Sequence, residues 1–277
     1  RLLLNDVGQP PKKWHCLIYS FIGFFFCCIT PAAGGGQPAQ VYFMHKDGLD
    51  PGTTTPILLL ITIGYKLVLV IFAILVKPFE MYLKSNGAIY WCMAGWIVNV
   101  IAITFFTLLI VYPEWVEKVC LNILDFASKF IKRERWITKL RNKLDNSIES
   151  YHEVSRCIKN NNKLFILVIL ISIIQRSILF SITWLVFQSF GITKFPLIEV
   201  ILLQSMVSLG TDMLPLPGGS GAHEALFLLL FTSLCGEELV LPILIASRGI
   251  SYYWQFIICG IMFLIFGIRL GKKKGSV

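Results

Sequence analysis

Charged side chains stand in the middle of apolar stretches at several places in this sequence of 277 residues. Three of them are cations, Lys66, Arg176 and Arg248, and two are anions, Asp212 and Glu224. An ionisable group in the middle of a membrane span is costly, so such groups are rare unless they face a cavity or a partner. A mixed set of this kind could bind the phosphate and the ammonium group of one polar lipid headgroup.

Each of these side chains has a structural alternative to a binding role. Arginine suits a phosphate because its planar guanidinium group can donate two parallel hydrogen bonds. Glu224 is either a helix-start residue that interacts with the helix dipole or a ligand for a headgroup amine, and His223 beside it could titrate. Lys66 and Arg176 could instead pair with carboxylates or carbonyl groups to orient helices. Arg248 could extend from a helix end to the membrane surface.

Residues 209–224, which contain both anions, cannot form an uninterrupted helix. Pro215 and Pro217 remove backbone donors, and the glycines that follow relax the backbone dihedral angles. At membrane depth, a broken helix is tolerated only where it is buried in protein or lines a wet cavity. A helix that starts after Gly221 would also point its free amide groups at an anion. This segment is therefore the main predicted site.

A second segment rich in proline and glycine, residues 29–40, directly follows the apolar run 17–29. Two interrupted hydrophobic segments in one chain are typical of transporters built from repeats, in which the substrate lies between broken helices. We therefore predict a substrate site shared by both segments and by the buried charges. Its residues are Pro31, Gly35, Gln37, Lys66, Arg176, Asp212, Pro217, Gly218, Gly219, Gly221, His223, Glu224 and Arg248.

The composition indicates a polytopic membrane protein. Hydrophobic residues make up 56% of the chain, charged residues make up 15%, and the mean hydropathy is +0.71, which is too apolar for a soluble domain of this size. The net charge of +9 is interpreted as a signal of membrane orientation, so no nucleic-acid partner is expected. The eight cysteines include no C-x-x-C pair and the four histidines include no H-E-x-x-H pair, which favours buried packing and predicts no metal or other cofactor.

The lengths of the apolar segments predict an all-α fold with two membrane halves, separated by residues 113–163. In that segment apolar residues recur every three or four positions, and eleven Lys/Arg residues outnumber seven Asp/Glu residues, so two amphipathic helices are expected on the cytoplasmic side. The N-terminal half (1–112) has a broken hairpin at 14–43, a polar loop at 44–55 and spans at 56–76 and 87–112. The C-terminal half (164–277) has a span at 164–190, a broken hairpin at 196–235 and a final span at 249–268.

This order of segments sets the orientation of the two broken hairpins. With residues 113–163 in the cytoplasm, the first hairpin enters the membrane from the cytoplasm and the second enters from outside. The basic C-terminal end then also lies in the cytoplasm. Hairpins that enter from opposite faces place a site near the middle of the membrane.

Three motifs resemble those of the lysylphosphatidylglycerol synthase transmembrane family, the flippase-like domain of the multiple peptide resistance factor. Residues 214–224 resemble its P-x-P-G-G-x-G-x-x-E signature, residues 21–38 resemble its F-x-G-x-F-F run followed by Thr-Pro and a glycine pair, and residues 248–254 resemble its Arg-plus-aromatic start to the last helix. The chain departs from the first motif at Gly36 and Gln37, where some relatives have Gly-Asp followed by Arg, which affects ion use at that end.

The resemblance implies movement of a phospholipid, such as lysyl-phosphatidylglycerol, across a bacterial cytoplasmic membrane, with resistance to cationic peptides as a consequence. It leaves open a phosphatidylglycerol lysyltransferase, for which His223 or Glu224 could act as the base, and a membrane subunit of a separate synthase. A transporter of small solutes with the same architecture is a further alternative. We expect the flippase-like part alone, without the soluble transferase domain of longer members. The implied partners are a membrane phospholipid and, as alternatives, a separate lipid synthase or a second copy of the chain.

Overall fold

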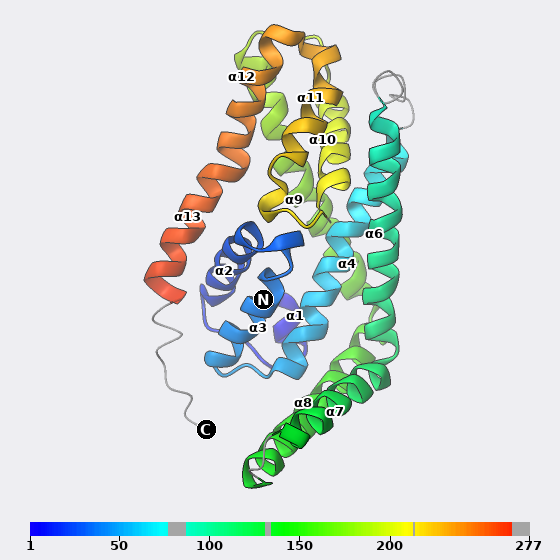
Figure 1. Ribbon diagram of the computed structural model, residues 1–277, viewed down its shortest axis with the longest axis vertical. Helices are drawn as coiled ribbons and strands as arrows, with labels where there is room; N and C mark the ends of the chain where they lie inside the picture. The colour runs from blue at the N-terminus through cyan, green and yellow to red at the C-terminus, as the bar shows by residue number, and fades with distance from the viewer. Residues whose placement is uncertain (77–86, 131–133, 213, 268–277) are drawn as a thin grey trace.

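The computed structural model describes residues 1–76, 87–130, 134–212 and 214–267, which form helices and no strands (Figure 1). The predicted all-α fold is confirmed. In chain order the elements are α1 (Leu2–Asp6), α2 (His15–Ile29), η1 (Pro31–Ala33), α3 (Gly36–Lys46), α4 (Pro51–Leu75), α6 (Ala88–Val111), α7 (Pro113–Phe130), α8 (Glu134–Asn160), α9 (Asn162–Ser189), α10 (Leu197–Thr211), η3 (Pro217–Gly219), α11 (Ala222–Cys235), α12 (Glu237–Arg248), η4 (Gly249–Trp254), α13 (Gln255–Met262) and η5 (Phe263–Gly267).

Four helical segments of the described chain are long and apolar enough to cross a membrane: Pro51–Leu75, Ala88–Val111, Asn162–Ser189 and Glu237–Phe266. Helices α2 and α10 are apolar but have only 15 residues each, about 22 Å, which is shorter than a hydrocarbon core of about 30 Å. The α2–α3 and α10–α11 pairs approach the middle of the bundle from opposite ends, and η1 packs against η3 (Figure 1). That each pair enters and leaves by one membrane face stays a prediction.

The start of α4 differs from the sequence-based boundary. Residues 51–55, predicted as the end of a polar loop, are the first turn of this helix. The carboxylate of Asp50 accepts a hydrogen bond of 3.0 Å from the backbone amide of Thr53, and Pro51 occupies the first helical position, where no amide hydrogen is needed. The helix-start residues therefore override the polar composition of the segment.

The start of the final span also differs from its predicted position. The final span is predicted to begin at residue 249, but the helical path runs from Glu237 to Phe266 through π-helical turns at Gly249–Trp254. A single glycine in a helix costs only about 1 kcal/mol, so apolar neighbours on both sides can keep the helix continuous. The predicted end of this span at residue 268, the basic tail and the connection at 77–86 lie outside the described residues.

Helices α7 and α8 form the predicted amphipathic pair, and α8 packs along α4. The contact is close at Gly52, where an added β-carbon would stand 1.8 Å from the carbonyl oxygen of Ser147. The hydroxyl of Ser147 also donates a hydrogen bond of 2.9 Å to Asp50. These contacts fix α8 to the first turn of α4, while the cytoplasmic location of the pair remains a prediction.

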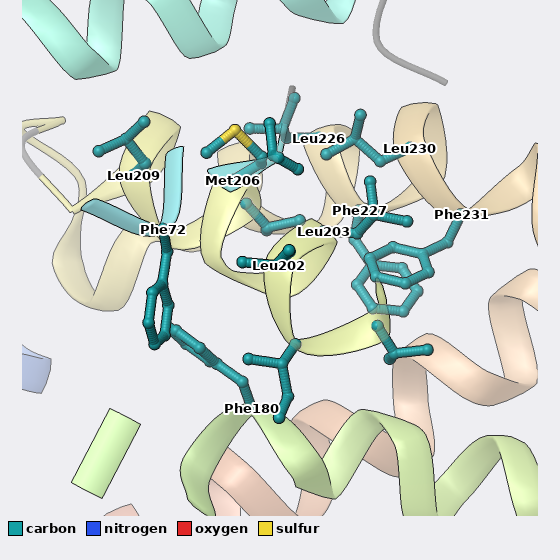
Figure 2. Close-up of a cluster of buried hydrophobic side chains, with 14 of the residues drawn as sticks. Phe72, Phe180, Leu202, Leu203, Met206, Leu209, Leu226, Phe227, Leu230 and Phe231 are labelled. Carbon is teal, nitrogen blue, oxygen red and sulfur yellow. The ribbon is translucent and has the colours of Figure 1, made fainter. Parts of the chain in front are cut away.

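The main hydrophobic cluster surrounds α10, which is buried along nearly its whole length. Figure 2 shows side chains of α10, including Leu203 and Met206, against Phe227 and Phe231 of α11. The two phenylalanine rings stack with centroids 4.3 Å apart. A helix that is apolar on all sides must be enclosed by other helices. Here α4, α6, α9 and α11 enclose it, so the break that follows α10 is held deep in the bundle.

A polar cluster joins the start of α2 to the end of α3 around the buried carboxylate of Asp47. Its oxygen Oδ2 accepts a hydrogen bond of 2.7 Å from the hydroxyl of Tyr19 and lies against the ring nitrogen Nδ1 of His15. The Nζ of Lys12 lies 3.8 Å from Oδ1. These contacts close the first helical hairpin at the end opposite to its break.

We expect this cluster to stabilise the fold in a pH-dependent way. Burial alone would raise the pKa of Asp47, but hydrogen bonds from Tyr19 and His15 and the charges of His15 and Lys12 outweigh burial and hold the pKa below its ordinary value of 3.8. Because the native carboxylate binds a proton less readily than the unfolded one, the stabilisation is present above that value and is lost as the pH falls through the lower native pKa.

Thermal unfolding of the detergent-solubilised chain, measured from about pH 7 to about pH 2, tests this expectation. The unfolding temperature of the wild type should fall with acid more steeply than that of Asp47→Asn, so that the two converge at the acid end. A difference between the two proteins that does not change with pH would contradict it.

Candidate functional site

The second break is built from three glycines in the left-handed region. Gly218, Gly219 and Gly221 have φ angles of +60°, +65° and +85°, which residues with a side chain rarely adopt. They turn the chain between the end of α10 and the start of α11, as the sequence predicts. Pro217 begins a 3₁₀ turn within this loop.

Arg248 holds this break together from the last helical segment. Its Nε donates a hydrogen bond of 2.8 Å to Oε1 of Glu224, and its terminal nitrogen donates one of 2.9 Å to the carbonyl oxygen of Gly218. The other carboxylate oxygen of Glu224 accepts a hydrogen bond of 2.5 Å from the amide of Gly221. Only 6% of Arg248 is exposed, so an extension to the membrane surface does not fit this geometry. Glu224 therefore both caps α11 and pairs with a buried cation.

Tyr252 connects the last helical segment to both breaks. The guanidinium group of Arg248 lies 4.4 Å from the centre of its ring, and its hydroxyl interacts with the thiol of Cys28 in α2. The same hydroxyl stands where a side chain on Gly218 would have to go, because an added β-carbon would lie 1.8 Å from it. The position of Gly218 is therefore constrained by both its backbone angles and its neighbour.

Gly218→Ala is consequently expected to destabilise the protein more than Gly221→Ala. Both alanines would have a positive φ angle, which residues with a side chain rarely adopt. Only the first would also collide with Tyr252, since nothing lies within 4 Å of an added β-carbon at Gly221, and overpacking adds about 1–3 kcal/mol. Unfolding in denaturing detergent would measure the difference. The double variant Gly218→Ala/Tyr252→Ala should recover the steric part, and equal losses at both glycines would contradict the explanation.

A second group of polar side chains satisfies the carbonyl groups at the end of α10. The Nζ of Lys66 donates a hydrogen bond of 3.0 Å to the side-chain oxygen of Asn99, which is fully buried. The amide nitrogen of Asn99 donates one of 3.2 Å to the carbonyl oxygen of Leu209, and Nε1 of Trp91 donates one of 3.0 Å to that of Gly210. These groups replace the helical partners that the broken end of α10 lacks.

Arg176, Lys66 and Asp212 gather around the partly buried ring of Tyr65. The guanidinium group of Arg176 lies 4.8 Å from the ring centre, and Nζ of Lys66 lies 5.4 Å from it. The Asp212 carboxylate is close enough to interact electrostatically with Tyr65 and Lys66. The structure thus brings together two predicted cations and one predicted anion that are far apart in the sequence.

The first break contributes mainly polar groups at a helix start. The hydroxyl oxygen of Thr30 accepts a hydrogen bond of 2.9 Å from the amide of Gly35, and the side-chain amide of Gln37 donates to the hydroxyl of Thr62 in α4. Pro31 begins η1, the turn that packs against η3. Cys27 interacts electrostatically with Asp212, so the two breaks and the Tyr65 cluster are neighbours. His223 lies beside Arg248 and Glu224.

Four of the polar side chains around the two breaks lie near the middle of the helices that carry them. Counted at about 1.5 Å per residue, Lys66, Asn99, Arg176 and Arg248 are about 16 to 22 Å from the start of helical segments that are about 36 to 45 Å long. Their positions at mid-length favour a site near the middle of a membrane, where a mixed set of charges could compensate a polar headgroup.

Comparison with known protein families identifies the chain. A family model described as the lysylphosphatidylglycerol synthase TM region matches residues 1–259. The chain belongs to this family. The match extends from α1 into α13 and includes both breaks and every candidate residue. No curated protein and no solved structure matches the chain.

Membership in the lysylphosphatidylglycerol synthase TM family supports a membrane-embedded protein with a role related to lipids. Both the synthesis of a lipid and its movement are compatible with that family description. Within the part of the chain that the structure describes, no three His, Cys, Asp or Glu side chains form a group that could hold a metal ion.

Proposed function

We propose that this chain moves a phospholipid with an anionic or aminoacyl headgroup, such as lysyl-phosphatidylglycerol, between the leaflets of a membrane. The observation that carries the proposal is the meeting of η1 and η3, with Lys66, Arg176 and Asp212 gathered beside the two breaks. A polar headgroup loses its hydration in hydrocarbon, and fixed charges at mid-depth compensate part of that loss.

The proposed roles follow from the chemistry of each group. Arg176 and Lys66 would bind the phosphate, because a guanidinium group and an ammonium group both donate charge-assisted hydrogen bonds to its oxygens. Asp212 would bind an ammonium group of an aminoacyl headgroup. Arg248 and Glu224 neutralise one another and brace the second break, so they maintain the geometry of the site. No covalent step is required.

The test is leaflet exchange by the purified chain in liposomes that contain a headgroup-labelled phospholipid. We expect label in the outer leaflet to become protected as lipid moves inward, at a rate that rises with the amount of protein. Uptake of a water-soluble solute without lipid exchange would overturn the proposal in favour of a solute transporter.

The description of the family as a synthase region favours a second candidate, in which the chain serves lipid synthesis. It would act either as a phosphatidylglycerol lysyltransferase or as a membrane subunit of a separate synthase. Transfer of lysine from lysyl-tRNA to phosphatidylglycerol by the purified chain would support the enzyme. Activity that appears only after a soluble synthase is added, with no lipid exchange by the chain alone, would support the subunit.

A further inference from the structure

A groove on the outside of the bundle runs between α3 and the first turns of α4. It has a volume of about 440 Å³ and is lined mainly by apolar surface. Its residues are Gln37, Pro38, Val41, Tyr42, His45, Pro51, Thr55 and Leu58. The groove lies apart from the charges around Tyr65, but one of its ends, Gln37, belongs to the first break.

The two ends of the groove lie at different depths along α4. Pro51 is the first residue of this membrane-spanning helix, so the end near His45 and Pro51 lies at the level of the membrane surface. Gln37 contacts Thr62, which is about 16 Å further along the helix at 1.5 Å per residue. That distance is about half of a hydrocarbon core of about 30 Å. The groove therefore extends from the surface to the middle of the membrane.

The chemistry of the lining changes along the same direction. At the surface end, His45 and Lys46 form the basic last turn of α3, and Lys46 lies over the ring of Tyr42 at 5.6 Å. Between the ends, Val41 and Leu58 present hydrocarbon. A lipid in the near leaflet has the same order of groups, with an anionic phosphate at the surface and a hydrocarbon chain below it.

We infer that this groove binds one acyl chain of a phospholipid, with its phosphate beside His45 and Lys46 and the chain directed toward Gln37. A lipid bound in this groove would lie next to the first break. Its role in transport rests on the proposed function, whereas its binding does not. The occupant is a lipid rather than a water-soluble solute, because the few polar groups in this mainly apolar lining could not replace the hydration of a solute.

Photolabelling by a phosphatidylglycerol that carries a photoreactive group in the middle of one acyl chain tests the inference. Mass spectrometry should find the label on α3 and on the first turns of α4, and excess unlabelled phosphatidylglycerol should compete it away, whereas glycerol phosphate should not. Val41→Trp should reduce this labelling at least about tenfold, because displacing two chain methylenes alone has about that effect. The smaller substitution Val41→Phe requires less repacking of the protein and should reduce the labelling by an intermediate factor.

Ile101→Trp is the matched control, since this residue of α6 is 61% exposed and does not line the groove. It should leave labelling of the groove unchanged. Labelling of α3 and α4 that is no more sensitive to competition than labelling along α6 would overturn the inference, because that is the behaviour of lipids that surround any membrane protein. Leaflet exchange by the same wild-type sample separates the two proposals. Exchange without groove labelling would support the proposed function and contradict the binding site. Groove labelling without exchange would support the binding site and contradict the proposed function.

Discussion

Arg248→Ala is expected to destabilise the protein by about 3–5 kcal/mol and to abolish lipid exchange. The substitution leaves the Glu224 carboxylate without its buried cation and removes the side-chain donor to the carbonyl group of Gly218. Breaking an ion pair whose cation is buried and whose carboxylate is partly buried is costly, because the remaining charge loses its compensation. Unfolding in denaturing detergent measures the stability, and leaflet exchange in liposomes measures the activity.

Two further variants make this expectation specific. The double variant Arg248→Ala/Glu224→Gln should regain part of the lost stability, because it also removes the uncompensated carboxylate. Arg156→Ala, which removes an exposed arginine of α8, should change neither stability nor exchange. If the double variant is less stable than Arg248→Ala, or if Arg156→Ala is equally damaging, the bracing role of this ion pair is wrong.

Lys66→Met is expected to separate stability from function. Removing the buried charge is favourable by itself, whereas leaving Oδ1 of the buried Asn99 without its donor costs about 1–3 kcal/mol, so the two effects offset one another and stability should change only slightly. Exchange should nevertheless slow about ten- to hundredfold, since a hydrogen bond to a charged group contributes about 1.5–3 kcal/mol. The two readouts should therefore move independently of one another.

Asn99→Leu supplies the comparison. It keeps the cation but removes the side chain that accepts from Lys66 and donates to the carbonyl group of Leu209, so it should destabilise the protein by about 1–3 kcal/mol. Adding Lys66→Met to it should recover stability without recovering exchange. Loss of stability in Lys66→Met that matches its loss of exchange would instead assign the lysine a structural role only.

The sequence predicts the architecture well because its signals are local. Runs of about 20 apolar residues indicate the spans, and proline with glycine indicates the breaks at 30–37 and 215–221. The boundaries that differ have local causes too, because Asp50 and Pro51 start a helix inside a polar segment, whereas Gly249 alone does not end one.

Most of the charged residues that meet around the two breaks could be named from the sequence, but their pairings could not. Charges within apolar stretches, such as Lys66 and Glu224, stand out because they are costly in a membrane. The pairing of Glu224 with Arg248 depends on how two helices are rotated against one another, which no local pattern specifies. Asn99 and Trp91 were missed, because a neutral polar group in an apolar span is a weak signal and their partners are backbone carbonyls in α10, more than a hundred residues away.

The central claim is that a lipid headgroup passes the charges around Tyr65, and leaflet exchange by Arg176→Gln tests it most directly. The matched control is Lys163→Gln, which removes an exposed cation near the start of the same helix, α9. With equal amounts of folded protein in the liposomes, Arg176→Gln should slow exchange of an anionic phospholipid by about tenfold or more, and Lys163→Gln should match the wild type. Equal rates for all three proteins would contradict the claim that these charges form the path of the headgroup.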